Sequence, residues 1–232
     1  MIGRTRICVV VSLFVALLTL AGCGGGGGAP ESSTPPGTLE VALEAEPPEL
    51  DPSLSSAYVD RQVMASIYDR LVDLDENGKI VPMLAKSWNV SGDGRTYTFE
   101  LEKGVKFHDG TPFDAEAVKF NLERYQKADS VRSTEIEPVQ SVEVVDDHTV
   151  RVELSEPFAP FLAVLTDRAG IMASPEAIEK SDGRISKNPV GTGPFQFVER
   201  VRGDHITLEK NPDYWQDGLP KLNKVVYNGI DD

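Results

Sequence analysis

Cysteine and histidine are scarce in this sequence. Its 232 residues include two cysteines, Cys8 and Cys23, and three histidines that lie far apart in the chain. A metal centre needs several such ligands at close spacing, and a lone histidine beside an aspartate, such as His108, is more typical of a turn. The sequence therefore predicts no metal, no cofactor and no catalytic group of this kind.

Basic residues are also few in comparison with acidic ones. Lys and Arg together number 23 and Asp and Glu 37, which gives a formal net charge of −14. Proteins that bind nucleic acids neutralise phosphates with Lys and Arg, so this balance argues against nucleic acid as a partner. An acidic, solvated surface fits a protein that works outside the cytoplasm.

Long apolar runs are absent except for residues 7–20, which follow Arg4 and Arg6. This run is too short to span a bilayer, but it has the length of the apolar region of an export signal. The run Leu20-Ala21-Gly22-Cys23 closes it with two small residues and a thiol. We therefore expect a lipoprotein signal peptide over residues 1–22 and a diacylglyceryl group on Cys23.

An ordinary secreted protein and a membrane-anchored N-terminus are the alternatives to this interpretation. Removal of the signal takes Cys8 away and lipid occupies Cys23, so no disulfide can form within the mature chain. Residues 23–37 are mostly Gly, Pro and Ser with few apolar side chains, which predicts a flexible tether. We expect an exported protein, anchored by lipid to the membrane on its periplasmic or extracellular face.

Alternation of apolar and polar residues predicts several β-strands after the tether. The clearest is residues 96–101, where Tyr97, Phe99 and Leu101 face one way. Others are expected at residues 39–43, 139–145, 149–154 and 225–227, and a strand from Phe195 turns at residues 202–204 and returns through residues 206–208.

Helical spacing appears between these strands. The expected helices are residues 58–71, a helix capped by Asp114 that runs to about residue 126, the apolar stretch 160–166, and residues 175–180, with proline at the first position. Strands and helices together predict an α/β fold, and the many hairpin turns argue against a plain doubly wound sheet.

Several short motifs have ordinary structural interpretations. Gly191-Thr192-Gly193 is not followed by Gly-Lys-Ser/Thr, so a backbone pivot near a cleft is favoured over a phosphate cradle. Arg202-Gly203-Asp204 is interpreted as a hairpin tip and not as an adhesion motif. No Gly-x-Ser-x-Gly elbow occurs, so the sequence offers no catalytic serine and predicts no enzyme.

Six motifs follow one another along the chain. They are residues 50–52 (LDP), 82–88 (PMLAKSW), 93–99 (DGRTYTF), 104–113 (GVKFHDGTPF), 190–195 (VGTGPF) and 211–215 (NPDYW). In this order the sequence resembles the extracellular solute-binding proteins of family 5, the peptide and nickel class of substrate-binding subunits of ABC importers. The resemblance covers nearly all of the chain after the tether.

That resemblance implies a type II periplasmic-binding-protein fold, a clamp of two lobes with the ligand between them. Residues 38–82 and 189–232 would form a mixed sheet beside the hinge, and residues 83–188 an inserted α/β subdomain. Members of this family are about twice as long as this chain. We therefore expect the N-terminal lobe without the C-terminal lobe.

The expected function is capture of peptides or similar small solutes for an ABC permease. Tyr58 and Asp60, beside the proline-rich loop, and Gly191, Thr192 and Gly193 are the candidate ligand-binding residues. Two alternatives stay open: a truncated lobe or interaction module that binds no solute, and a secreted hydrolase. With half of a cleft, affinity for peptides should be no better than about millimolar, roughly 4 kcal/mol.

Overall fold

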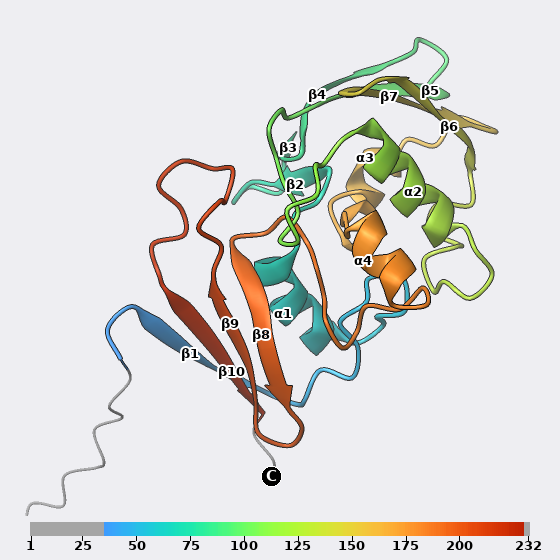
Figure 1. The fold of residues 1–232 in the computed structure, drawn as a ribbon. Helices are drawn as coiled ribbons and strands as arrows, with labels where there is room; N and C mark the ends of the chain where they lie inside the picture. The colour runs from blue at the N-terminus through green and yellow to red at the C-terminus, as the bar shows by residue number, and fades with distance from the viewer. Residues whose placement is uncertain (1–34, 230–232) are drawn as a thin grey trace, which may run out of the picture. The chain divides into compact units, whose positions relative to one another are not determined.

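The computed structural model describes residues 35–229 (Figure 1). The predicted signal peptide, Cys23 and the predicted tether up to residue 34 lie outside these residues. Within residues 35–229 no helix is long and apolar enough to cross a membrane.

One sheet joins the two ends of the described chain. Its strands are β1 (Thr38–Leu43), β8 (Phe195–Val201), β9 (His205–Lys210) and β10 (Lys224–Gly229), in the order β1-β10-β9-β8. β1 is parallel to β10, and the other pairs are antiparallel, so the sheet is mixed. The hairpin between β8 and β9 turns at residues 202–204, as the sequence predicts.

The other four-stranded sheet is antiparallel throughout. Its strands are β4 (Ala85–Val90), β5 (Thr96–Leu101), β6 (Val139–Asp146) and β7 (Thr149–Leu154), in the order β4-β5-β7-β6. Tyr97, Phe99 and Leu101 are buried, as alternation predicts. Helix α2 (Ala115–Tyr125) packs against this sheet, and Asp114 caps it by accepting a hydrogen bond from the Ala117 backbone N.

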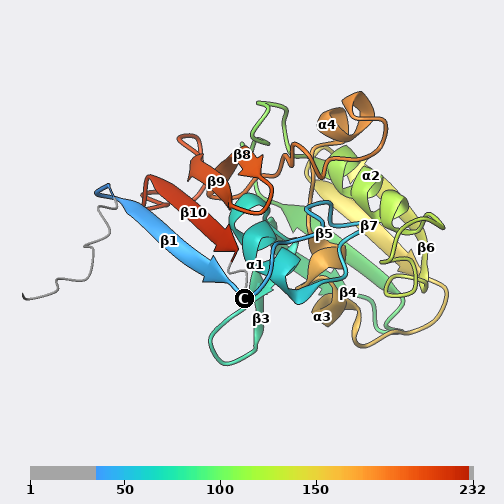
Figure 2. The ribbon, with the colours of Figure 1, turned by 90° about the horizontal axis from the view of Figure 1, so that it is seen from below.

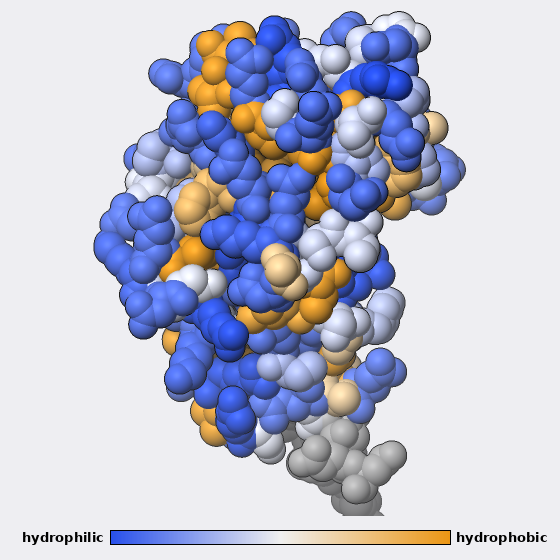
Figure 3. Space-filling model, turned by 90° about the vertical axis from the view of Figure 1, so that its right-hand side faces the viewer, coloured by the Kyte–Doolittle hydropathy of each residue, from blue (hydrophilic) through white to orange (hydrophobic). Residues whose placement is uncertain are grey.

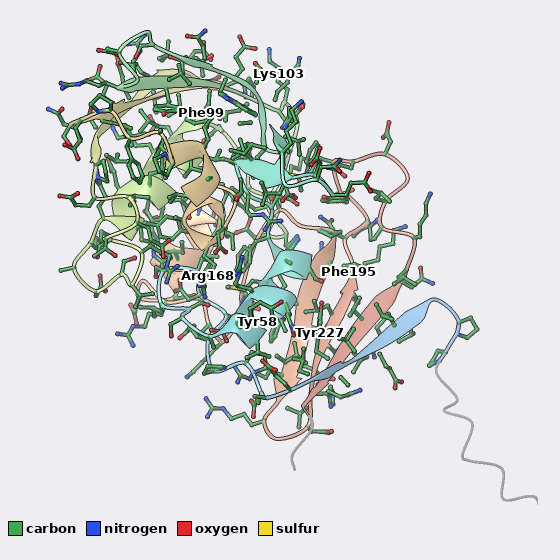
Figure 4. All side chains as sticks on the ribbon, turned by 180° about the vertical axis from the view of Figure 1, so that it is seen from behind. Tyr58, Phe99, Lys103, Arg168, Phe195 and Tyr227 are labelled. Atoms are coloured by element: carbon green, nitrogen blue, oxygen red, sulfur yellow. The ribbon has the colours of Figure 1, made fainter. Side chains whose placement is uncertain are left out.

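Shorter elements connect the two sheets. β2 (Val72–Leu74) and β3 (Ile80–Pro82) form a separate hairpin, and α1 (Tyr58–Ile67) lies against the mixed sheet beside Phe195 and Tyr227 (Figures 2 and 4). α3 (Phe161–Val164), the 3₁₀ helix η1 (Arg168–Gly170) and α4 (Pro175–Lys180) follow β7. The apolar stretch 160–166 thus gives only one turn of α-helix.

Each sheet has its own apolar core. The core of the antiparallel sheet includes Phe99 and Tyr125, and that of the mixed sheet includes Ile67 and Leu208. The strands of each sheet lie within the predicted subdomain ranges, but the cores cross those boundaries, since Leu71 packs in the first core. The division at residues 83–188 stays a prediction.

Helix α1 is shorter than the sequence predicts. It ends at Ile67, and Tyr68 is extended, with φ −121° and ψ 147°. Beyond it the chain pairs with residues 170–172: Leu71 N donates to the Gly170 carbonyl at 2.9 Å, and Met172 N to the Asp69 carbonyl at 3.1 Å. The helical spacing of Leu71 was misleading because this residue is buried from an extended segment.

Candidate functional site

A buried carboxylate fixes the loop that leads into α1. The Asp51 side chain has no exposed surface and accepts hydrogen bonds from the backbone N and the hydroxyl of Ser53, at 3.0 and 2.9 Å. Its Oδ2 lies 2.5 Å from Nη2 of Arg124 on α2, whose side chain is 7% exposed. A buried ion is costly without its partner, so this pair ties the loop to α2.

Asp60 supports the same loop from the first turn of α1. Its carboxylate accepts hydrogen bonds from the backbone N of Glu49 and of Ala57, both at 3.2 Å, and from the Ser55 hydroxyl at 2.9 Å. A carboxylate in this turn is also favoured by the helix dipole. Because Asp60 is fully buried, a ligand would reach it only if the loop moved.

Two further arginines hold the end of the loop. Arg132 Nη2 donates to the Ser55 carbonyl at 3.2 Å, and Arg168 Nη1 donates to the Ala57 carbonyl at 3.2 Å. Burial lowers the pKa of the Arg168 guanidinium, and the positive charge of Arg132 lowers it further. An additional negative group beside Arg168 would therefore be favourable.

A pocket of 260 Å³ lies on the exposed face of α1. We call it the α1 pocket; its lining residues are Tyr58, Arg61, Gln62, Ala65, Tyr68, Arg70, Asp167, Arg168 and Ile171. Tyr58 is 65% exposed, and the Arg61 guanidinium lies 6.0 Å from the centre of its ring. Figure 4 labels Tyr58 on α1 and Arg168 on η1.

The walls of the α1 pocket hold three arginines and one carboxylate, and Arg70 is also paired with Asp73 at 2.9 Å, so the pocket keeps a positive charge within an acidic chain. Asp167 Oδ1 lies 3.0 Å from Arg61 Nε and 3.8 Å from Arg168 Nε. Arg168 Nε is buried and has no hydrogen-bond partner among residues 35–229. A small ligand with an anionic group would find complementary charge here, next to the aromatic ring of Tyr58.

Gly191-Thr192-Gly193, which we call the glycine-rich turn, packs against the end of α1 and does not line the α1 pocket. A Cβ on Gly191 would lie 2.2 Å from the Ile67 carbonyl O, and one on Gly193 2.5 Å from the Ile67 carbonyl C. Gly193 N donates to the Ile67 carbonyl at 2.9 Å. Glycine is needed at both positions because the two backbones are in contact.

Three sequence motifs meet at this turn. Thr192, which is fully buried, donates its hydroxyl to Asp69 Oδ2 at 3.0 Å, and Trp215 Nε1 donates to the same oxygen at 2.8 Å. On the other side, His108 Nε2 is 2.9 Å from the Gly193 carbonyl. Burial lowers the pKa of His108, which favours the neutral ring that donates there through Nε2. The turn is therefore held from both sides.

Of the five candidate residues, only Tyr58 lines the α1 pocket. Asp60 and Thr192 are fully buried, and Gly191 and Gly193 contact the backbone at the end of α1, so none of these four is in its walls. Sequence reasoning missed Arg61, which follows Tyr58 by one helical turn, opposite the apolar stripe of α1. That spacing could have revealed it, whereas Arg168 is brought to the pocket only by tertiary folding.

A larger hollow of 600 Å³ lies between α2 and α4. Figure 3 shows a side of the molecule where the surface is mostly hydrophilic, with separate hydrophobic patches. The walls of the hollow include five carboxylates, of Asp114, Glu116, Glu123, Glu176 and Glu179. No candidate residue lines it, and no group of three His, Cys, Asp or Glu within residues 35–229 is placed to hold a metal ion. The α1 pocket is therefore the better candidate.

Residues 79–232 match the family described as bacterial extracellular solute-binding proteins, family 5 Middle. The chain belongs to this family. It is 39% identical over 194 residues to the glutathione-binding protein GsiB of Salmonella paratyphi A and 38% identical to that of Pectobacterium atrosepticum. These alignments cover 83% of the chain but 38% of each relative, so the chain spans little more than a third of their length.

Solved structures of family members share the fold. AgaA of A. tumefacien R10, in complex with agropinic acid, has a TM-score of 0.79 and 33% identity over 83% of this chain and 40% of its own. NikZ of Campylobacter jejuni, in complex with Ni(L-His), has a TM-score of 0.78 and 30% identity over 85% of this chain and 40% of its own. The resemblance and the type II periplasmic-binding-protein fold predicted from the sequence are confirmed.

Proposed function

We propose that this chain contributes to solute capture by the binding protein of an ABC importer, and that the α1 pocket is its part of the ligand site. The observation that carries the proposal is the pairing of an exposed Tyr58 with three arginines around 260 Å³ of space. The chain would act by binding and not by catalysis. Its partners would be a small solute and an ABC permease.

Peptides or similar small acids are the ligands that suit the pocket best. The relatives named above are a glutathione-binding protein and a protein solved with agropinic acid, and DppA of Helicobacter pylori was solved with the peptide STSA. Each of these ligands has a carboxylate that can pair with a guanidinium. In this chain Arg61 and Arg168 would make that contact, since among residues 35–229 Asp167 is the one carboxylate in an ion pair with both.

Calorimetric titration with glutathione, the tripeptide probe, tests this proposal. The variant Arg61→Gln should bind the probe about tenfold more weakly, which corresponds to about 1.4 kcal/mol, because one charge-assisted contact is lost. Arg61 is 42% exposed in its side chain, so the fold should be little affected. Lys119→Gln on α2 removes a positive charge away from the pocket and is the matched control.

The diethyl ester of the tripeptide separates charge from shape, because it lacks both carboxylates. It should bind the unmodified chain more weakly than the free acid does. Equal affinities for acid and ester, or equal losses in the Arg61 and Lys119 variants, would contradict an anion-binding pocket. Absence of binding by any probe would favour the alternative of an interaction module.

We further propose that Cys23 is lipidated and retains the protein at the membrane. A single acyl chain holds a protein only marginally, so stable retention needs the diacylglyceryl group. Cys23→Ser should move the protein from the membrane to the soluble fraction, whereas Cys8→Ser, within the signal, should not. Cell fractionation and mass spectrometry of the N-terminal peptide measure this, and an unmodified Cys23 at the membrane would contradict it.

A further inference from the structure

Asp69 is a buried carboxylate between the α1 pocket and the glycine-rich turn. The residue is 2% exposed, and its side chain accepts three hydrogen bonds. Oδ2 accepts from Thr192 Oγ1 at 3.0 Å and from Trp215 Nε1 at 2.8 Å, and Oδ1 accepts from the Tyr214 hydroxyl at 3.2 Å. Burial raises the pKa of Asp69, and the three donors oppose that effect.

The residues on either side of Asp69 line the α1 pocket. Tyr68 and Arg70 both belong to its walls. Asp69 itself does not line the pocket, because its carboxylate is directed to Thr192, Tyr214 and Trp215. The Asp69 side chain thus binds this wall of the pocket to residues that lie outside the pocket.

The backbone anchors the same wall from the other direction. The Asp69 carbonyl accepts from Met172 N at 3.1 Å, and Arg70 forms an isolated β-bridge with Ile171. Ile171 also lines the pocket. Leu84 N and Ala85 N also donate to the carbonyls of Arg70 and Leu71. The side-chain bonds of Asp69 add a connection from this segment to Thr192, Tyr214 and Trp215.

We propose that Asp69 is a positioning residue for the α1 pocket: it holds Tyr68 and Arg70 in place by joining their segment to Thr192, Tyr214 and Trp215. This inference rests on the proposed function only for its effect on ligand affinity. The effect on the pocket wall itself can be measured without a ligand.

Two substitutions at Asp69 separate hydrogen bonding from charge. Asparagine has one acceptor oxygen and one NH₂ group. With its oxygen toward Thr192 and Trp215, its NH₂ can donate to the Tyr214 hydroxyl, which can accept. Asp69→Asn can therefore keep the geometry, whereas Asp69→Ala loses all three bonds. Val152→Ala, a truncation in the core of the antiparallel sheet, is the control that lowers stability away from the pocket.

Amide hydrogen exchange of the full chain without ligand is the first measurement. Asp69→Ala should increase exchange at residues 68–71 and 170–172 by about tenfold relative to Val152→Ala, and Asp69→Asn should stay close to the unmodified protein. Equal protection of these residues in Asp69→Ala and Val152→Ala would overturn the proposal. This outcome does not depend on which solute is bound.

Titration with the tripeptide probe is the second measurement. Affinity should fall by about 3- to 30-fold in Asp69→Ala, which is the range for residues that act on a site through a packed network, and by much less in Asp69→Asn. An unchanged affinity in Asp69→Ala would overturn the positioning role. If the unmodified chain does not bind the probe, the proposed function fails for that ligand while hydrogen exchange still decides the role of Asp69.

Discussion

The antiparallel sheet β4-β5-β7-β6 and the mixed sheet β1-β10-β9-β8 each have four strands and a helix against one face, yet different contacts secure them. The antiparallel sheet pairs strands in hairpins around apolar side chains such as Phe99. The mixed sheet pairs β1 with β10 from the other end of the chain. Around it, buried polar groups and backbone contacts at glycine connect α1, the loops, α2 and η1. The stability of the antiparallel sheet depends mainly on buried apolar volume. The stability of the mixed sheet depends also on single hydrogen bonds and close backbone contacts.

The largest effect is expected from a cavity in the antiparallel sheet. Phe99 has no exposed surface, so Phe99→Ala should lower the free energy of unfolding by about 3 to 5 kcal/mol. Thr98→Ala, on the opposite side of the same strand, should cost far less. Urea denaturation of both variants tests whether apolar volume dominates here, and equal losses would show that it does not.

A somewhat smaller loss in the free energy of unfolding is expected when the buried ion pair that links the two regions is broken. Arg124→Met leaves the Asp51 carboxylate buried without its cation and should cost about 3 kcal/mol. Arg151→Met breaks the exposed ion pair with Glu143 and should cost less than about 1 kcal/mol. If thermal or urea unfolding gives the two variants the same stability, the pair does not secure the loop.

The third largest loss of stability is expected where the backbone of the glycine-rich turn contacts α1. Gly191→Ala forces a methyl group against the Ile67 carbonyl and should cost about 1 to 3 kcal/mol. Gly92→Ala, where a Cβ would meet nothing within 4 Å, is the matched control and should be close to neutral. A Gly191 variant as stable as the control would mean that α1 can move away from the turn at no cost.

The smallest effect depends on pH. Because burial lowers the pKa of His108 below its ordinary value of 6.5, the unfolded chain takes up this proton first as the pH falls. The contribution of neutral His108 to stability is therefore complete above about pH 6.5 and is lost as the pH falls through the lowered pKa. The contribution is about 1.4 kcal/mol for each pH unit between the pKa of His108 in the unfolded chain and its pKa in the folded chain.

His108→Gln keeps a donor toward the Gly193 carbonyl but has no proton to take up. Its free energy of unfolding, measured by urea denaturation between about pH 7.5 and 5.5, should change less than that of the unmodified protein. Parallel pH profiles for the two proteins would place the acid sensitivity elsewhere in the molecule.

Local patterns in the sequence predicted most of the antiparallel region, although they did not predict strand β4. The strand 96–101, the helix capped by Asp114 and the hairpin 139–154 all lie where alternation, spacing and capping place them. Residues close in sequence make these elements, and one apolar face decides their orientation. The six motifs, taken together, also identified the family correctly.

The pocket and its support were decided by the tertiary structure. Tyr58 can be found from the sequence because it begins a helix after a proline-rich loop, but Asp167 and Arg168 lie at the start of a 3₁₀ helix more than 100 residues later. The apolar stripe that continues to Leu71 predicts a helix through Asp69, whereas α1 ends at Ile67. The burial of Asp69 depends on donors from Thr192, Tyr214 and Trp215, which no local pattern reveals.

By itself, then, the sequence determined most of the strands, the helices α2 and α4 and the family, because each follows from neighbours along the chain or from an ordered set of motifs. Only the tertiary structure decided where α1 ends, which face of it forms a pocket and which charges gather there. The physical reason is that these features depend on hydrogen bonds and close contacts between distant segments, whose partners have no fixed spacing in the sequence.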